Sequence, residues 1–303
     1  MLGWVRGIQV CCPEAGMIVV GESDVAVSKS SIFISMSDMV EHGLTGRELS
    51  PHLGFLLKAT SIVGFVLVWT LLSTIVAVYG LFNPIFLPSP GTVFGKIWEM
   101  ALARQLEVHI MATLQRVVIG FSLAAFLAVT LGALAGRWRW LRHLLEPVVE
   151  VLRPIPPLAM LPLFIVWAGI GEVSKVVFIT YATFFPMFLT TVHGVLHVDP
   201  ILLRAAASLG AGQTQQFLRV ILPAAFPEIL TGLRLGVALS FFVIVISEFI
   251  GAEHGLGFLI NDGRNFFLVP QMLGAAVVLG ILGYACNELL QLVERRLLRW
   301  QHR

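Results

Sequence analysis

Residues 199–228 read DPILLRAAASLGAGQTQQFLRVILPAAFPE and lie between two long apolar segments of the chain. Asp199 can cap a short helix that begins at Pro200, and Gly210 permits the left-handed residue that ends such a helix. The small side chains of residues 205–207 keep one surface of this helix thin. A short, thin helix suits a groove on another protein. The stretch therefore predicts a docking element that interrupts an otherwise apolar chain.

The composition of the chain excludes a soluble enzyme. Only 13% of the 303 residues are charged, against roughly 25% in soluble domains. Hydrophobic residues make up 57%, and a water-soluble surface with that content would expose very large apolar patches. The net charge of +2 is too small to indicate nucleic-acid binding. The three cysteines form neither a disulfide framework nor a set with the spacing of metal ligands. The composition indicates a polytopic membrane protein.

Six windows are long and apolar enough to cross a bilayer, which requires about 20 residues per helix. In lipid every backbone amide needs a partner within the chain, so these windows are expected to be helices. The fifth window contains Arg234 and Glu248, whereas the other five carry no Asp, Glu, Lys or Arg. The expected spans of this all-α fold are residues 59–82, 117–136, 154–171, 176–198, 229–250 and 265–287.

The distribution of lysine and arginine predicts that both termini lie in the cytoplasm. With this orientation most of the basic residues fall in cytoplasmic segments, as the positive-inside rule requires. Residues 199–228 are then cytoplasmic, whereas Arg116 and Lys175 fall in outer segments. Pro223 and Pro227 are expected to break the chain before it re-enters the bilayer.

The second window carries small residues at every fourth position, which places them on one helical face. Such a stripe lets two helix backbones approach closely in lipid, where no hydrophobic force drives association. The partner is either another span of the same chain or a second subunit. The stripe consists of Gly120, Ala124, Ala128, Gly132 and Gly136.

The stretch RPIPPLAMLPL at residues 153–163 covers the start of the third window, and its prolines must bend or break the helix. Arg153 stands at this break, and a charge inside a span costs roughly 2.5–3.5 kcal/mol even on a lenient scale. We therefore take Arg153, Pro154, Pro156 and Pro157 as candidates for the lining of a translocation path. The alternative is an arginine that snorkels to the inner boundary.

Glu248 is a further path candidate, because a carboxylate within a span is a functional-site hypothesis by default, although it also could lie near the outer boundary. One rival interpretation is an ion-coupled secondary transporter that pairs Glu248 with Arg153, and a second rival is a membrane scaffold. Secondary carriers commonly show broken helices in both halves, and the sequence has one. His193 and His197 have helical spacing but no third ligand, so we expect structural histidines and no metal site.

The docking stretch resembles the Glu-Ala-Ala loop of bacterial ATP-binding-cassette importer permeases. In that pattern Glu-Ala-Ala is followed by three residues, a glycine, a spacer of about ten residues and then hydrophobic-Leu-Pro. Arg204 occupies the glutamate position, which puts in question any polar contact made by that glutamate. The resemblance implies that the ATPase is contacted by Arg204, Ala205, Ala206, Ser208, Leu209, Gly210, Leu222 and Pro223.

Other motifs resemble the branch of that superfamily that imports nitrate, sulfonates, taurine or thiamine-precursor pyrimidines. The resemblance covers residues 87–299 and does not fix the solute. The motifs are LPSPGTVF at 87–94, LRPIPPLAMLPLFIVWAGIG at 152–171, GLRLG at 232–236 and SEFIGAEHGLGFLI at 247–260.

The resemblance implies a type I importer permease of the bacterial inner membrane. Its domains are a poorly ordered extension over residues 1–54 and a permease domain over 55–303. The implied partners are ATPase subunits, a periplasmic solute-binding protein, membrane lipid and a second permease copy, expected to form a homodimer. The chain itself should be no enzyme and hold no cofactor, because ATP and Mg belong to the partner ATPase. The nearest approach to a phosphate loop, residues 91–97, has the wrong glycine spacing.

Overall fold

The computed structural model describes residues 51–81 and 83–298, and every regular element in these residues is a helix. The chain divides into two compact units, residues 1–67 and 68–303. Helix α2 (Pro51–Tyr79) continues from the first unit into the second, and residues 51–67 are the described part of the first. Most of the expected 1–54 extension lies outside the described residues.

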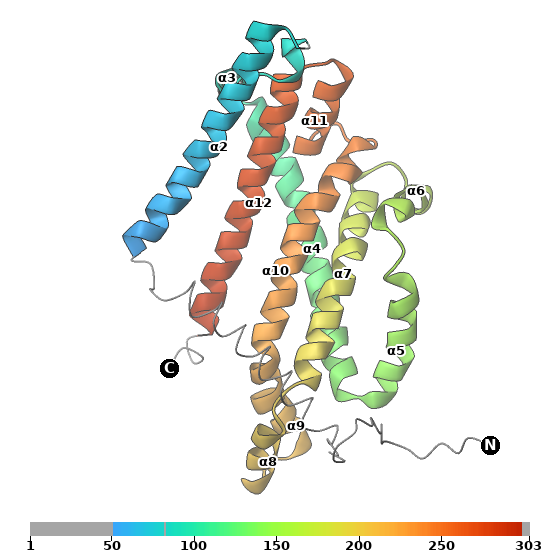
Figure 1. Ribbon diagram of the computed structural model, residues 1–303. Helices are drawn as coiled ribbons and strands as arrows, with labels where there is room; N and C mark the ends of the chain where they lie inside the picture. Colours follow the sequence, from blue (N-terminus) through green and yellow to red (C-terminus); the bar gives the residue numbers. More distant parts are fainter. Residues whose placement is uncertain (1–50, 82, 299–303) are drawn as a thin grey trace, which may run out of the picture. The chain divides into compact units, whose positions relative to one another are not determined.

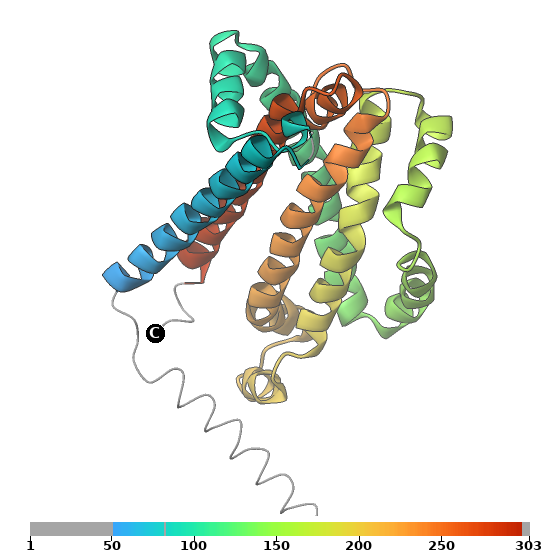
Figure 2. The ribbon, with the colours of Figure 1, turned by 45° about the horizontal axis from the view of Figure 1, so that its top comes forward.

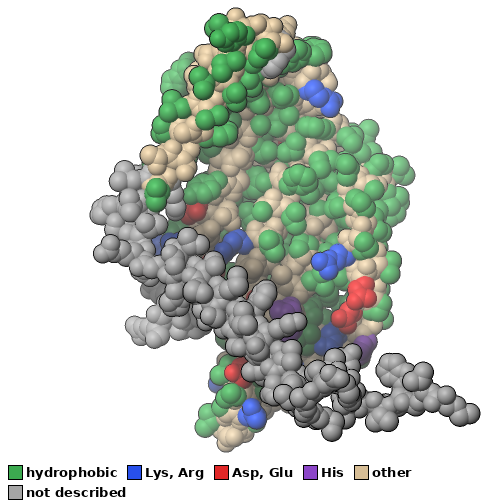
Figure 3. Space-filling view, viewed as in Figure 1, with side chains coloured by type: hydrophobic (Ala, Val, Ile, Leu, Met, Phe, Trp, Pro, Cys, Tyr) green, Lys and Arg blue, Asp and Glu red, His purple; other side chains and the backbone are tan. Residues whose placement is uncertain are grey.

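The expected all-helical membrane architecture is confirmed. Within the described residues, five helices are long and apolar enough to cross a membrane, or six if one sharply bent pair counts as a span. Figure 3 shows apolar side chains spread over the visible helices of the second unit, with few charged side chains among them. The five continuous spans are Ala59–Tyr79, Gln105–Arg137, Glu172–Leu196, Gln213–Phe249 and Val269–Leu297.

The second unit is built around three long helices that lie side by side, α4 (Gln105–Arg137), α7 (Glu172–Leu196) and α10 (Leu222–Phe249) (Figure 1). Two short helices, α8 (Pro200–Ser208) and α9 (Gln213–Gln216), lie at one end of this group. The opposite end carries α3 (Pro90–Leu102) and α11 (Leu256–Asn265), and α12 (Val269–Leu297) runs from that end alongside the group. The 3-10 turn η1 (Pro84–Phe86) precedes α3.

The small-residue stripe of α4 packs against α7 of the same chain. A Cβ atom added at Gly132 would lie 2.8 Å from the Cβ of Thr191, and one at Gly120 would lie 2.8 Å from that of Ile179. Ala124, within the stripe, is fully buried. The stripe is thus an intramolecular contact between two parallel helices, which resolves the alternative in favour of a span of the same chain.

The opposite side of α7 receives α10 through a second set of glycines. A Cβ at Gly236 would lie 2.8 Å from the Sδ of Met187, and one at Gly194 would lie 2.7 Å from the Cβ of Glu228. Because α7 is approached closely from both sides, it is the central helix of the unit. Phe178 and Ile179 of α7 are accordingly completely buried.

The third expected span is broken, as its prolines predict, but its bounds differ from the expected window. Helix α5 (Arg139–Leu152) and helix α6 (Pro157–Ala168) meet at an angle of 101° (Figure 2). Window 154–171 is therefore not one straight span, because α6 has 12 residues and the path across the membrane includes α5. Helix α5 carries several charged side chains, so its residues are not part of the expected apolar window 154–171.

The expected break at Pro223 and Pro227 is wrong. Pro223 lies in the first turn of α10, Pro227 lies inside that helix, and the π-helical turn η2 (Phe217–Ile221) joins α9 to α10. The amide of Leu222 donates to the carbonyl of Phe217, five residues back. This wider turn accommodates the next residue, Pro223, which has no N–H to donate. Residues Gln213–Phe249 consequently form one continuous span of 37 residues.

We predict that Gly132→Ala destabilises the protein. The added Cβ would overlap Thr191, and overpacking of a tight contact costs about 1–3 kcal/mol. The measurement is the apparent melting temperature of the purified protein in detergent. Gly280→Ala in α12 is the matched control, because nothing lies within 4 Å of its added Cβ and alanine favours a helix by up to about 1 kcal/mol. Equal melting temperatures for the two variants would contradict the proposed close approach.

Candidate functional site

The short helix at the end of the bundle begins and ends as its sequence predicts. The side chain of Asp199 accepts a hydrogen bond of 2.7 Å from the amide of Ile201, and Pro200 occupies the first turn. Gly210 has a φ of +79°. The amide of Gly210 donates to the carbonyl of Ala207 and that of Ala211 to Ala206, which is the Schellman arrangement. Both ends of α8 are therefore fixed by local hydrogen bonds.

Most of the expected coupling residues are exposed, with those of 204–210 on or just after α8 and Pro223 in the first turn of α10. The side chain of Ala206 is buried against the unit, whereas the side chain of Leu209 is 88% exposed. Among the described contacts, the Arg204 side chain bonds only with the backbone of its own helix, its Nε donating to the carbonyl of Pro200 at 3.4 Å. The other exposed members are Ala205, Ser208, Gly210 and Pro223, while Leu222 is half-buried and packs against the cluster that contains Val195, Ala225 and Ile229.

Two contacts connect this end to the long helices. At the end of α4, the Arg137 guanidinium donates to the carbonyl of Gln213 at 3.0 Å and lies over the Phe217 ring at 5.0 Å. On α7 the ring of His193 stacks on that of His197, with centroids 3.8 Å apart, and its Nδ1 lies 3.6 Å from an oxygen of Glu228. These histidines thus have structural contacts, and no group of three metal-binding side chains occurs among the described residues.

An ion-pair network lies at the other end of the unit and centres on Arg116. Arg116, Lys175 and Glu248 are buried, whereas the Glu172 side chain is 62% exposed. The Arg116 guanidinium donates two hydrogen bonds of 2.5 and 2.7 Å to Glu172 at the start of α7 and one of 2.7 Å to Glu248 of α10. Lys175, which is also buried, donates to Glu172 at 3.1 Å. Two cations therefore face two carboxylates, and a charge-balanced cluster joins α4, α7 and α10.

Glu248 also fixes the beginning of α11. Its carboxylate, fully buried, accepts hydrogen bonds from the amide of Gly257 at 2.7 Å and from the Thr113 hydroxyl at 2.9 Å. The same hydroxyl accepts from the amide of Leu256 at 2.8 Å. A carboxylate near free amides and the positive end of a helix is favourable. A Cβ at Gly255 would overlap the Glu248 carboxyl, so a side chain there would displace the carboxylate.

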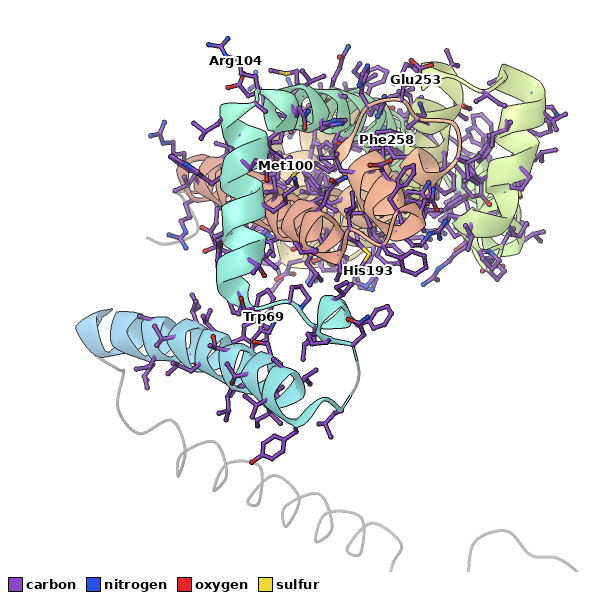
Figure 4. All side chains as sticks on the ribbon, turned by 90° about the horizontal axis from the view of Figure 1, so that it is seen from above. Trp69, Met100, Arg104, His193, Glu253 and Phe258 are labelled. Atoms are coloured by element: carbon purple, nitrogen blue, oxygen red, sulfur yellow. The ribbon has the colours of Figure 1, made fainter. Side chains whose placement is uncertain are left out.

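The α10–α11 loop completes this end of the molecule. His109 of α4 accepts a hydrogen bond from the amide of Gly255 at 3.0 Å and stacks on the ring of Phe258. Arg116 also donates to the carbonyl of His254 at 2.6 Å. Figure 4 looks down on this end, with Glu253 of the loop and Phe258 of α11 labelled. The network thus holds the loop as well as the three long helices.

The sequence placed Arg116 and Lys175 in the segments outside the apolar windows, whereas the structure places both within helices that form candidate spans, α4 and α7. Helix α4 begins at Gln105, twelve residues before the apolar window, and this added part contributes His109 and Arg116 to the contacts described above. The rival pairing of Glu248 with Arg153 is wrong, since Glu248 pairs with Arg116. One feature of the sequence could have indicated the pairing of Arg116 with Glu172. The two residues carry opposite charges, and each lies directly beside an apolar window.

The remaining path candidates lie where the bent pair turns. Arg153, Pro154 and Pro156 are exposed, and Pro157 is half-buried as the first residue of α6. The carbonyl of Leu152 accepts two hydrogen bonds at the break, one of 3.2 Å from the amide of Ile155 and one of 3.3 Å from the Tyr181 hydroxyl of α7. The structure thus separates Arg153 from Glu248, the former exposed and the latter enclosed.

Comparison with known proteins gives concordant matches. Residues 128–302 match the family described as binding-protein-dependent transport system inner membrane component. The chain is 34% identical over 270 residues to the taurine transport system permease protein TauC of Escherichia coli (strain K12), covering 88% of this chain and 98% of that protein. It is 34% identical over 223 residues to the putative aliphatic sulfonates transport permease protein SsuC of Bacillus subtilis (strain 168), covering 74% and 81%.

The fold itself matches a solved transporter. An inward-facing structure of the MetNI methionine ABC transporter superposes with a TM-score of 0.55 at 19% identity, covering 65% of this chain and 98% of the matched chain. At this identity the likeness concerns the fold alone. The match agrees with the helical arrangement described above.

We predict that Arg116→Met strongly destabilises the protein and that Glu248→Gln partly restores it. Removing one partner of a buried ion pair costs about 3–5 kcal/mol, because the other charge stays buried without compensation. The double variant removes that uncompensated charge, and the amide oxygen of the new side chain can still accept from Gly257. The measurement is the apparent melting temperature in detergent over the full double-mutant cycle.

Lys96→Met serves as the matched control for this cycle. Lys96 forms an ion pair with Glu99 at 3.0 Å, but the glutamate side chain is 68% exposed, so the loss should be no more than about 1 kcal/mol. Strictly additive losses for Arg116→Met and Glu248→Gln would show that the two charges do not stabilise each other.

Proposed function

The chain belongs to the family of binding-protein-dependent transport system inner membrane components, and from this premise we propose that it carries a small sulfonate, with taurine as the first candidate. It is the permease subunit of an ATP-binding-cassette importer, and separate ATPase subunits hold the nucleotide and Mg and hydrolyse ATP. The observation that supports taurine is the match to TauC along nearly the whole of that protein. The match to SsuC supports the wider class of aliphatic sulfonates.

We further propose that α8 docks on the ATPase at the cytoplasmic face. The exposed side chain of Leu209 offers an apolar anchor, and Ala205 lets a groove approach the helix closely. The caps at Asp199 and Gly210 fix the helix before it binds, which lowers the entropy that docking would otherwise cost. The end of α12 lies on the same side, in agreement with a cytoplasmic C-terminus.

The continuous span Gln213–Phe249 offers a mechanical route from this docking site to the other side of the membrane. Its 37 residues extend over about 55 Å as a helix. One end contacts α8 and the Arg137 side chain, and the other carries Glu248 of the Arg116 network. When ATP-driven closure moves α8, a stiff span of this kind transmits a rigid-body tilt between inward- and outward-facing states.

The proposed assembly contains two permease copies, two ATPases and a solute-binding protein. The binding protein delivers the solute at the face that carries α11, opposite to α8. A homodimer is the simplest arrangement of the two permease copies, and a heterodimer with a related permease is the alternative. Arg153 and the prolines at 154, 156 and 157 are proposed to line the path between the two faces, with Arg153 attracting an anionic group.

The proposal predicts ATP-dependent uptake of taurine by proteoliposomes that contain the permease, its ATPase and its binding protein. The measurement is radiolabelled taurine inside the vesicles with ATP and with a non-hydrolysable analogue. Ethanesulfonate, nitrate and a pyrimidine serve as competitors, because the motifs are also compatible with those classes. Competition by nitrate or the pyrimidine but not by taurine would replace the solute, and uptake without nucleotide would remove the mechanism.

Leu209→Asp is expected to abolish co-purification of the ATPase while the permease still inserts into the membrane. A carboxylate in an apolar groove must be desolvated without a partner, which costs several kcal/mol. Leu102→Asp at the end of α3 is the matched control, because Leu102 is 70% exposed at the opposite end of the unit. The measurement is the ATPase-to-permease ratio after affinity purification. A ratio that falls equally in both variants would argue against docking through α8.

A further inference from the structure

Helix α5 differs from the other helices of the unit because it carries a stripe of charges. With 3.6 residues per turn, these side chains fall within an arc of about 100° around the helix. The stripe contains both signs and reaches the break between α5 and α6. It consists of Arg139, Arg142, His143, Glu146 and Glu150, continued by Arg153 just beyond the helix.

This charged helix lies at membrane depth. Val149 of α5 is buried in the cluster that contains Phe185 and Phe188 of α7. The carbonyl of Leu152 accepts a hydrogen bond from Tyr181, which lies about 14 Å along an α7 helix that is about 37 Å long. Helix α5 therefore runs along α7 from the end that carries α8 toward the middle of that span, rather than lying across the end of the bundle, as Figure 1 also shows.

The side chains of α5 divide into three faces. Val149 packs on α7 together with the half-buried Leu145 and Leu152. A second face is apolar and exposed, with Leu144 at 61% and Val151 at 69%, and it suits lipid. The third face is the charged stripe, in which His143, Glu146, Glu150 and Arg153 are exposed.

The charged face cannot be a lipid-facing surface, because a charge in the hydrocarbon region is costly and such residues face a protein interior or a water-filled cavity. In the part of the chain that the structure describes, no ion pair within 4.0 Å joins the stripe to another side chain. The apolar face of the same helix is available for contact with lipid. We therefore infer that water hydrates the charged side chains.

We propose that the charged stripe of α5 lines the water-filled transport path and that Glu146, Glu150 and Arg153 contact the solute as it passes. The inference rests on the proposed transport function and extends it to a second set of residues. A path that presents carboxylates and a guanidinium along one wall suits a small solute with both an ammonium and an anionic group. Taurine has this chemistry, with one amino group and one sulfonate.

The test compares single cysteines on two faces of the same helix. Cys11, Cys12 and Cys286 are first replaced by alanine in the full transporter. Glu146→Cys and Glu150→Cys then report the charged face, and Leu144→Cys and Val151→Cys are matched controls on the apolar face. A membrane-impermeant, charged thiol reagent should modify the first pair about tenfold faster or more, because a thiol in water ionises whereas one in lipid stays protonated. Equal rates, or slower reaction at 146 and 150, would overturn the proposal.

A second measurement tests contact with the solute. With ATP, binding protein and taurine present, modification of the cysteine at 150 should slow severalfold relative to turnover without taurine, while the slow rate at 144 should not change. Modification that is unaffected by taurine at both 146 and 150 would reject solute contact. The accessibility comparison needs no transported solute. If taurine uptake failed, the comparison would still test whether the charged stripe faces water, and only the proposed identity of the solute would change.

Discussion

The structure depends on how closely three helix backbones approach one another. In lipid no hydrophobic force holds helices together, so contact requires side chains small enough to let dispersion act between backbones. Gly132 of α4 meets Thr191 of α7, and Gly236 of α10 meets Met187 on the other side of α7. These contacts fix three parallel or antiparallel rods, and both the docking end and the ion-pair end are positioned on them.

The Arg116 network explains why a fully buried carboxylate is tolerated at the end of a span. Glu248 loses its hydration on burial, and it regains partners from Arg116, Thr113 and the amide of Gly257. The arrangement carries no excess charge, because Lys175 and Arg116 balance two glutamates. Its consequence is geometric: the start of α11 cannot move without disturbing α4, α7 and α10. A continuous span then connects this cluster with the proposed ATPase-docking helix.

Proline has opposite effects at two places in the chain. At residues 153–157, where prolines stand at positions 154, 156 and 157, the chain bends by 101° between α5 and α6. At Pro223 the helix continues, because the residue stands in a first turn that follows a π-helical turn. The wider turn already accommodates the missing N–H at Pro223, whereas at the bend the carbonyl of Leu152 accepts from both the Ile155 amide and the Tyr181 hydroxyl. Proline therefore occurs both at the sharp bend between α5 and α6 and within the continuous helical span that contains α10.

The sequence by itself determined the fold class, the apolar spans, the capped helix at 199–210 and the glycine stripe, because each depends on neighbours within a few residues along the chain. Only the tertiary structure decided that the stripe meets α7, that Arg116 pairs with both Glu172 and Glu248, and that Arg153 stays apart from Glu248. Those pairings join residues that are 56 to 132 positions apart. Short-range patterns carry no information about such distances, and burial of a charge is favourable only once its distant partner is in place.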